Sequence, residues 1–325
     1  MSNVEFLVAR ARIVRAIRAF FDEKGFVEVE TAVRIPAPAP EEHIDCPPCR
    51  DGGYLRASPE LQMKKLLAAG MDRIYQIGPC FREGERGSRH SPEFTMIEWY
   101  RRKATYLEIR RDLEELMGTL SKEGLNGDCS PHRGACPQGV AQKCLTLPVR
   151  EAYLKYAGWD PWAGWDQDRF DFDMATKIES AIKALGGGVF LTDYPPQAAS
   201  LARISPDAHS VPAHQKSQTS KLPNLPTSKR SNLPFAYAER WEFYWDGMEL
   251  ANCFTELCDE TEQRARFVAA KTNRQVLGEA DYPLDEDFLV SLPRIGSAAG
   301  VALGIDRLVM VLTGATEIAS VRAPL

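Results

Sequence analysis

The 325-residue chain lacks any apolar run that approaches the roughly 18 residues of a membrane-spanning helix. It also lacks an N-terminal secretion signal, because arginines interrupt the segment where the apolar core of a signal would lie: Arg10, Arg12, Arg15 and Arg18. Hydrophobic residues make up 44% of the chain and charged residues 26%, which is typical of soluble globular proteins. We therefore expect a cytoplasmic protein without a membrane segment.

An excess of basic residues is missing as well. The chain has 40 lysines and arginines against 45 acidic residues, so its formal net charge is −5. Proteins with a large nucleic-acid interface usually carry a basic excess or a long basic face. Extensive contact with a nucleic acid is therefore not expected.

Three common catalytic signatures do not occur: the Walker A loop, the Rossmann glycine pattern and the Gly-x-Ser-x-Gly elbow. The chain has eight cysteines, and a cytoplasmic location argues against a disulfide framework. Cys46 and Cys49 have metal-ligand spacing and could bind a structural zinc with two of Cys129, Cys136 and Cys144. Reduced, unpaired cysteines are the favoured alternative.

Apolar periodicity and turn residues predict that helices interrupt a set of strands. Ser58 is expected to cap a helix that starts at Ser58-Pro59-Glu60, and Asp246-Gly247 to form a hairpin turn. The expected elements are helix 4–24, strand 26–31, helix 58–69, strands 73–77 and 94–100, helix 105–120, a mostly helical region 146–184, a strand from 190, hairpin 241–250 and helix 260–278.

This order predicts an α+β fold, in which an antiparallel sheet is flanked by helices. We expect one domain over residues 1–325, with an irregular insert at about 123–145. Residues 205–234 contain almost no large apolar side chains, so a disordered linker is expected there.

The loop 81–93 is rich in arginine and glycine. It places Arg82, Arg86 and Arg89 around two glycines. Planar guanidinium groups bind phosphate oxygens in a bidentate manner, so the loop predicts a polyphosphate site. An exposed basic loop without a ligand is the simpler alternative.

The strand after this loop predicts a second kind of site. Phe94, Met96, Glu98 and Tyr100 fall on one face because side chains of a strand alternate. A carboxylate and a phenol on the same face suit a cationic group. The alternative is an ordinary half-buried strand.

Segment 300–314 combines a strand of small residues, a glycine turn and a short helix. Asp306 suits the first turn of that helix and Gly314 its C-terminal cap. Arg307 follows the turn and could reach a phosphate. Small strand residues leave room for a flat ligand close to the backbone.

Segments 81–100 and 300–312 together resemble motifs 2 and 3 of the class II aminoacyl-tRNA synthetases, and 89–100 resembles their lysine-specific branch. Motif 1 would be helix 4–24 with strand 26–31. The resemblance covers about residues 6–312, apart from two insertions. It implies the class II catalytic fold, ATP-dependent activation of an amino acid with Mg²⁺, and a two-fold homodimer.

The resemblance also implies roles in ATP binding. Arg82 would hold the α-phosphate and Arg307 the γ-phosphate, and these two arginines would be catalytic. Arg89 and His90 would hold the outer phosphates. The full implied ATP site is Arg82, Glu83, Gly84, Glu85, Arg89, His90, Phe94, Glu249, Leu250, Gly304 and Arg307.

Magnesium ligands are expected at Glu249 and Glu256, in a segment similar to a family motif. Seven residues separate them, so an unbroken strand would put them on opposite faces, and we expect a bulge between them. Acids that merely face solvent on a hairpin are the alternative.

For the amino acid, the resemblance implies that Glu98, Tyr100 and Glu256 surround the side-chain ammonium of a lysine-like substrate. Ser58 and Glu60 would bind its amino end. The full implied substrate site is Ser58, Pro59, Glu60, Glu98, Tyr100, Asn252, Glu256 and Ala302.

Motif 1 begins within the first ten residues, so the anticodon-reading OB-fold of this branch is expected to be absent. The short architecture resembles the family of elongation factor P–(R)-β-lysine ligases, and Trp99 and Arg101 fit that family. Ala302 stands where lysyl-tRNA synthetases typically have glycine, which favours (R)-β-lysine over lysine without deciding between them. Elongation factor P is the expected acceptor and tRNA is not. The alternatives are a truncated lysyl-tRNA synthetase-like enzyme that acts on tRNA, and a catalytically degenerate binding paralogue.

Overall fold

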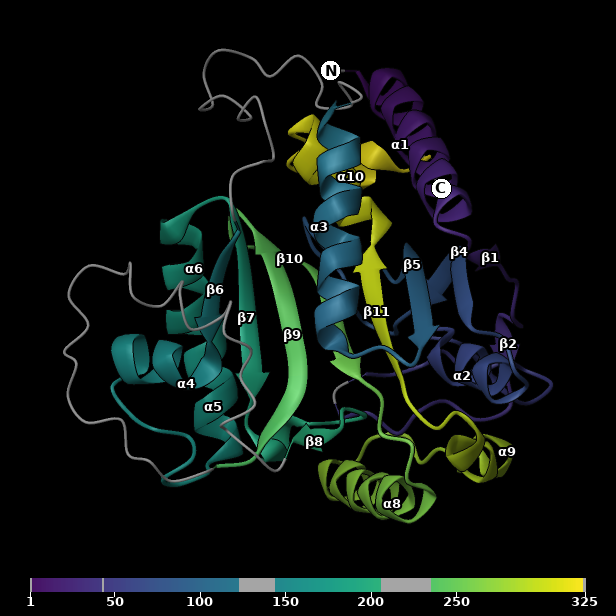
Figure 1. Cartoon of the computed structure of the whole chain (residues 1–325), viewed down its shortest axis with the longest axis vertical. Coiled ribbons are helices and arrows are strands. Elements are labelled where there is room, and N and C mark those ends of the chain that lie inside the picture. Colours follow the sequence, from purple (N-terminus) through teal and green to yellow (C-terminus); the bar gives the residue numbers. More distant parts are fainter. Residues whose placement is uncertain (1, 43, 123–143, 206–234, 324–325) are drawn as a thin grey trace. The chain divides into compact units, whose positions relative to one another are not determined.

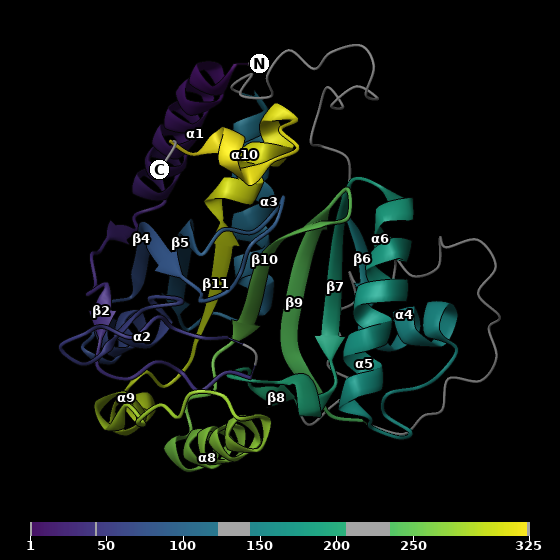
Figure 2. The same cartoon turned by 180° about the vertical axis from the view of Figure 1, so that it is seen from behind.

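The computed structural model describes residues 2–42, 44–122, 144–205 and 235–323 (Figures 1 and 2). The chain divides into two compact units, Met1–Gln142 with Glu256–Leu325, and Lys143–Thr255. The expected insert and linker fall almost entirely outside the described residues, and the expectation of one domain stays a prediction. In the described part of the chain, no helix combines the length and the apolar character needed to cross a membrane.

The first unit is built on a sheet in the order β1-β4-β5-β11. β1 runs parallel to β4, and the other neighbours are antiparallel. A separate small sheet pairs β2 with β3. These strands are β1 (Val27–Glu28), β2 (Arg34–Ile35), β3 (Tyr54–Leu55), β4 (Arg73–Phe81), β5 (Glu93–Arg102) and β11 (Ala298–Gly304).

Helices pack around this sheet. Figure 1 shows α3 crossing in front of β11, and Figure 2 shows it behind, so α3 covers one face. The helices of this unit are α1 (Asn3–Glu23), α2 (Glu60–Ala68), α3 (Tyr106–Lys122), α8 (Glu260–Leu277), α9 (Glu286–Ser291) and α10 (Ile305–Thr313), with 3₁₀ turns at Leu292–Arg294 and Ile318–Val321.

Aromatic side chains pack α1 against the sheet. Phe21, fully buried on α1, stacks on Tyr75 of β4 with ring centroids 4.9 Å apart and lies 5.1 Å from Trp99 of β5. Large buried rings bring much apolar area and specific geometry to a core. The predicted first helix is therefore confirmed, and its buried face is Ile13, Ala16, Ile17, Phe20 and Phe21.

In the second unit the strands follow the order β10-β9-β7-β6, with β8 beside β9. Its strands are β6 (Leu145–Pro148), β7 (Gly188–Tyr194), β8 (Ile204–Ser205), β9 (Tyr237–Trp245) and β10 (Met248–Thr255). Its helical segments are α4 (Val149–Ala152), α5 (Gln167–Asp173) and α6 (Glu179–Leu185), π-helical turns at Tyr153–Ala157 and Met174–Ile178, and a 3₁₀ turn at Pro196–Ala198.

The expected hairpin is confirmed and is longer than predicted. Asp246 and Gly247 both have positive φ, 47° and 74°, as a tight two-residue turn requires. The β9–β10 register shifts between Glu249 and Ala251, which is the irregularity that the spacing of the two acids called for.

Two expectations about elements were wrong in extent. The strand expected over 26–31 is only β1, because Thr31 bonds through its backbone N–H to the side chain of Gln76 at 3.0 Å rather than to a neighbouring strand. The region 146–184 opens with strand β6 instead of a helix, since residues 145–148 pair in parallel with β7. Both differences depend on partners that are distant in the sequence.

Candidate active site

The candidate site begins at Glu98, a carboxylate buried on β5. Glu98 is 1% exposed and accepts hydrogen bonds from Ser58 Oγ at 2.6 Å and from the Tyr100 hydroxyl at 2.8 Å. The predicted shared face of Glu98 and Tyr100 is therefore confirmed. Burial raises the pKa of Glu98 to about 7, with a smaller contribution from the negative charge of Glu60.

Ser58 and Glu60 reach the site from the start of α2. Ser58 Oγ accepts the backbone N–H of Glu60 at 2.9 Å while its hydroxyl donates to Glu98. The expected N-cap is shifted by one residue, because the Pro59 carbonyl accepts the first helical bond, from Met63 N at 2.9 Å. Ser58 therefore links the helix terminus to the carboxylate.

Lys64 joins the same cluster, and the sequence reasoning missed it. Its side chain is 1% exposed and forms ion pairs with Glu60, at 2.5 Å, and with Glu256. Burial alone would lower the pKa of Lys64, but the charges of Glu256 and Glu60 raise it overall. Burial raises the pKa of Glu256 to about 8. The four-residue spacing of Glu60 and Lys64 on one helix was a signal that could have found half of this pairing.

Strand β11 places small residues beside the carboxylate cluster. In the β5–β11 register, Gly300 lies opposite Tyr100, and Ala302 opposite Glu98. A Cβ atom on Gly300 would stand 2.1 Å from the Tyr100 ring and 3.0 Å from Glu256 Oε1. Any side chain at position 300 would therefore displace the Tyr100 ring.

The arginine loop lies between β4 and β5, and Gly84 turns it with φ of 78°. Arg82 pairs with Glu85 at 3.3 Å, and its guanidinium carbon is 5.3 Å from the centre of the Phe94 ring. Glu83 is anchored through its backbone N–H, which donates to the Asp45 carbonyl at 2.7 Å. The loop thus presents Arg82 over an aromatic ring.

Arg307 meets this loop from the first turn of α10. Its Nη2 atom is 2.7 Å from His90 Nε2, and its Nε donates to the Arg89 carbonyl at 3.4 Å. Partial burial and the positive charge of Arg307 lower the pKa of His90, and Arg82 and Arg89 act in the same direction. A neutral imidazole can accept the guanidinium N–H. The structure therefore brings the Arg307 guanidinium to His90 and to the backbone carbonyl of Arg89.

Asp306 holds the start of α10 in place. This carboxylate is 2% exposed, accepts the Thr95 N–H at 2.8 Å and pairs with Arg322 at 3.4 Å and with Arg10. Asp306 thereby ties α10 to β5 and α1. The expected role of Asp306 as a first-turn helix residue is confirmed.

Glu249, Leu250 and Asn252 belong to the second unit, on β10. Leu250 is buried, Glu249 is half-buried, and Asn252 Oδ1 accepts from Arg240 Nε at 3.0 Å. Across the described residues, no three His, Cys, Asp or Glu side chains gather closely enough to hold a metal ion.

The zinc hypothesis is only partly covered by the structure. Cys129 and Cys136 lie outside the described residues, so their part in it stays a prediction. Burial raises the pKa of the Cys46 thiol to about 11, which favours the protonated form. The six described cysteines form no disulfide with one another, as expected.

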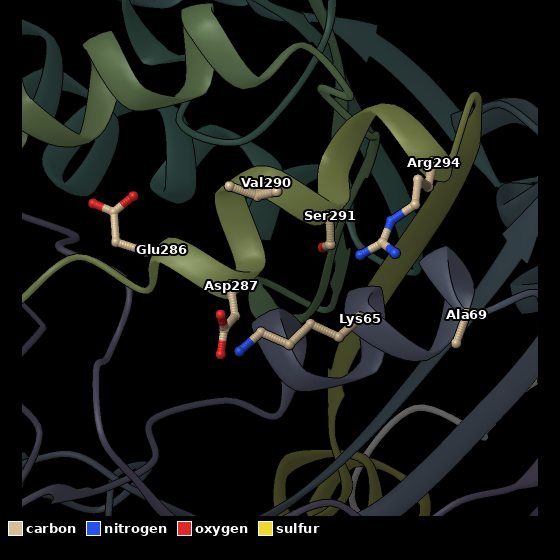
Figure 3. A pocket seen from close by; sticks show the side chains of 7 residues that line it. All are labelled: Lys65, Ala69, Glu286, Asp287, Val290, Ser291 and Arg294. Atoms are coloured by element: carbon tan, nitrogen blue, oxygen red, sulfur yellow. The ribbon is translucent and has the colours of Figure 1, made fainter.

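A hollow of about 360 Å³ in the first unit lies between α2 and α9 (Figure 3). Lys65 and Arg294 line it, and Lys65 pairs with Asp285 at 2.6 Å. None of the residues expected in the site lines this hollow. Neighbours on α2 thus face different surroundings, Lys64 the buried carboxylates and Lys65 the hollow.

An antiparallel sheet flanked by helices, an arginine loop between two of its strands and a strand–helix corner that carries a further arginine define a class II synthetase-type catalytic unit. The family described as "tRNA synthetases class II (D, K and N)" matches residues 2–323, and the chain belongs to that family. The expected fold class is confirmed.

Individual proteins of this family are similar to nearly the whole chain. The chain is 32% identical to "Elongation factor P--(R)-beta-lysine ligase" of Proteus mirabilis (strain HI4320) over 99% of this chain and 95% of the relative. The protein of that name from Histophilus somni (strain 2336) is 33% identical over 98% of this chain and 94% of its own. "Lysine--tRNA ligase" of Moorella thermoacetica is 33% identical over 98% of this chain and 64% of its own length.

Proposed function

We propose that this chain is an ATP-dependent ligase that activates lysine or (R)-β-lysine as an adenylate and transfers it to a lysine side chain of elongation factor P. The observation that carries the proposal is the buried carboxylate cluster around Glu98, which lies in the same unit as the arginine loop. Relatives named elongation factor P–(R)-β-lysine ligase, similar over nearly the whole chain, support the choice of substrate and acceptor.

The first step needs positioned cations more than it needs a base. The substrate carboxylate, already an anion, attacks the α-phosphorus of ATP, and pyrophosphate leaves. The protein has to align two anions and neutralise the phosphorus oxygens. We assign the α-phosphate to Arg82, the outer phosphates to Arg89 and His90, and the γ-phosphate to Arg307. The remaining ATP contacts are assigned to Glu83, Gly84, Glu85, Phe94, Leu250 and Gly304.

Magnesium fits this scheme with one protein carboxylate and phosphate oxygens, since Mg²⁺ is usually held in that way beside a nucleotide. Glu256 fits the role of metal ligand poorly, because its carboxylate already pairs with the buried Lys64 ammonium. We therefore assign Glu249 to the metal and Glu256 to the amino acid. Bound magnesium would neutralise phosphate charge during the displacement.

The carboxylate cluster suits a substrate that carries two ammonium groups. Glu98, Tyr100 and Glu256 would surround the side-chain ammonium, and Ser58 and Glu60 the amino group nearer the carboxylate. A buried carboxylate binds an ammonium strongly because little water competes for it. Pro59, Asn252 and Ala302 complete the proposed amino-acid site.

In the second step the acceptor lysine attacks the carbonyl carbon of the adenylate, a C–N bond forms, and AMP leaves. A lysine side chain has an unperturbed pKa near about 10.4, so it must lose a proton before or during the attack. The adenylate phosphate or a nearby carboxylate could take that proton. The amide product then stays on the protein acceptor.

A specific experiment separates the candidate functions. ATP–pyrophosphate exchange would be measured with lysine and with (R)-β-lysine, and transfer of the labelled amino acid would then be followed to elongation factor P and to tRNA. Exchange with either isomer and transfer to elongation factor P are expected. Similarity to lysine–tRNA ligase over 98% of the chain favours tRNA charging as the second candidate. Efficient tRNA charging without transfer to the protein would establish that alternative.

We also infer a two-fold homodimer. Its support is apolar surface on the motif 1 segment, where Val4 is 69% exposed, Val8 47% and Val27 52%. Val4 and Val8 lie one turn apart on α1, and neighbouring exposed apolar side chains suit a protein interface. Light scattering should give twice the mass of the chain at micromolar concentration, and a monomer there would contradict the inference.

A further inference from the structure

Lys64 is an ammonium built into the pocket that the proposed function assigns to an ammonium-bearing substrate. Its side chain is 1% exposed, and its partners Glu60 and Glu256 have side chains 15% and 0% exposed. A buried charge is tolerated when it is paired, and removal of one partner leaves the other costly. Lys64 and Glu256 therefore depend on each other.

The Glu256 carboxylate keeps one oxygen available. Its Oε2 atom forms the ion pair with Lys64, whereas Oε1 accepts no hydrogen bond from any residue that the structure describes. Oε1 and the Tyr100 ring would stand 3.0 Å and 2.1 Å from a Cβ atom placed on Gly300, so this oxygen and the ring face the same side of β11. An unsatisfied buried oxygen in such a position calls for a donor from a ligand.

The formal charges of the cluster are a separate observation. The cluster holds three carboxylates, Glu60, Glu98 and Glu256, and one ammonium, that of Lys64, which pairs with Glu60 and Glu256. The net formal charge of the cluster is about −2 when all four groups are ionised. Lysine and (R)-β-lysine each carry two ammonium groups. The fixed charge of the pocket thus balances the cationic groups of this class of substrate.

Among the residues that the structure describes, Lys64 is the cation that forms ion pairs with Glu60 and Glu256. Cys80 on β4 stays a neutral thiol because burial raises its pKa to about 12. Arg56 donates to the carbonyls of Thr31, at 2.9 Å, and of Pro79, at 3.2 Å. Ser58 and Tyr100 are neutral donors to Glu98.

We propose that Lys64 is a positioning residue that sets the selectivity of the pocket for diamino acids. Lys64 pairs with Glu60 and Glu256 together and so holds two carboxylates of different elements at a fixed separation. Its positive charge also leaves the cluster with a net negative charge that two substrate ammonium groups would balance. The proposal rests on the proposed function and adds to it the residue that tunes the charge of the site.

The test compares four proteins in ATP–pyrophosphate exchange: wild type, Lys64→Met, the double variant Lys64→Met/Glu256→Gln, and the control Lys65→Met. Lys64→Met should raise the KM for the preferred lysine isomer at least about thirtyfold, because it leaves buried carboxylates without their cation. The KM for ATP should stay within about threefold, since the arginine loop is untouched. A purely structural defect would instead lower the amount of active enzyme for both substrates.

The double variant restores the charge balance, and glutamine keeps an oxygen that can accept from the substrate. The KM for lysine of the double variant should therefore be at least about tenfold lower than that of Lys64→Met. Lys65→Met removes a comparable ion pair, with Asp285, outside the cluster and beside the hollow between α2 and α9 (Figure 3), so it should leave the KM for lysine at its wild-type value. If Lys64→Met does not fold, the double variant, which lacks both charges, should fold and show this recovered KM.

The outcomes distinguish a failure of the proposed function from a failure of the inference about Lys64. A wild type without exchange for either lysine isomer would overturn the proposed function and this inference with it. A wild type with exchange, combined with an unchanged lysine KM in Lys64→Met, would overturn the inference alone. A double variant that is no better than Lys64→Met, or that does not fold, would also contradict it.

Discussion

The first unit carries two charged regions that are organised in opposite ways. The acidic cluster around Glu98 and Lys64 is buried, and short ion pairs and hydrogen bonds join its members. The arginine region is open: Arg89 and His90 are exposed, and Arg82 and Arg307 are half-buried. The acidic region is largely paired internally and leaves Glu256 Oε1 without a hydrogen bond from the described residues, whereas the arginine region presents several positive charges close together.

The difference teaches how each region can recognise its ligand. In the buried cluster little water competes, so small changes in shape or charge should alter selectivity strongly. In the open region, cations that repel one another are stabilised when a polyphosphate binds. We therefore expect substitutions in the arginine region to affect chemistry, and substitutions in the acidic cluster to affect the choice of amino acid.

The largest effect is expected from removal of the phosphate-binding arginines. Arg82→Ala and Arg307→Ala should each lower the rate of ATP–pyrophosphate exchange by at least about a hundredfold, because charge on the reacting phosphate is no longer neutralised. Circular dichroism should be unchanged. Arg86→Ala, in the same loop but outside the proposed phosphate contacts, is the matched control and should lose less than about fivefold. A wild-type rate of exchange in Arg82→Ala or Arg307→Ala would contradict the expectation that substitutions in the arginine region affect the chemistry.

Gly300→Ala tests the buried region by shape alone. A Cβ atom would stand 2.1 Å from the Tyr100 ring, so the ring must move away from Glu98. We expect the KM for lysine to rise at least about tenfold, with the KM for ATP nearly unchanged. Gly118→Ala on α3 is the control, because a Cβ there meets nothing within 4 Å. An unchanged lysine KM in Gly300→Ala would show that the Tyr100 ring does not shape the pocket.

Ala302→Gly should change the selectivity of the buried region between lysine and (R)-β-lysine. Ala302 lies opposite Glu98 in the sheet, and one methyl group in a pocket changes preference by about 1–3 kcal/mol. The ratio of kcat/KM for lysine over (R)-β-lysine should rise by about tenfold, within that range. Parallel exchange assays with both isomers measure it. A ratio that stays constant would place the choice of isomer elsewhere.

The smallest effect concerns the pH dependence of stability. Burial raises the pKa of Glu98 to about 7, so between about pH 5 and that value the folded chain keeps a proton that the unfolded chain has released. The free energy of unfolding should therefore fall as the pH rises, by up to about 1.4 kcal/mol per pH unit from this group. Urea unfolding of wild type and Glu98→Gln at several pH values isolates the contribution. Equal slopes in the two proteins would contradict the burial argument.

Much of the fold and of the candidate site could be predicted from the sequence alone. Local patterns sufficed for α1, α3, α8 and α10, for the Asp246-Gly247 turn and for the face that Glu98 shares with Tyr100, because each depends on residues close together in the chain. The arginines of the loop and Arg307 were recognised by their chemistry and by the resemblance of their motifs. These features need no knowledge of distant contacts.

Tertiary structure decided the features that depend on distant partners. Lys64 follows the apolar side of α2 with Leu61 and Leu67, where a lysine would ordinarily be unfavourable. It is stable there because Glu256, far away in the sequence, supplies an opposite charge in the same buried place. Likewise, Asp306 on α10 meets Arg10 across 296 positions of sequence. Local sequence determines which elements form, but only the folded chain brings together the charges that make a buried lysine possible.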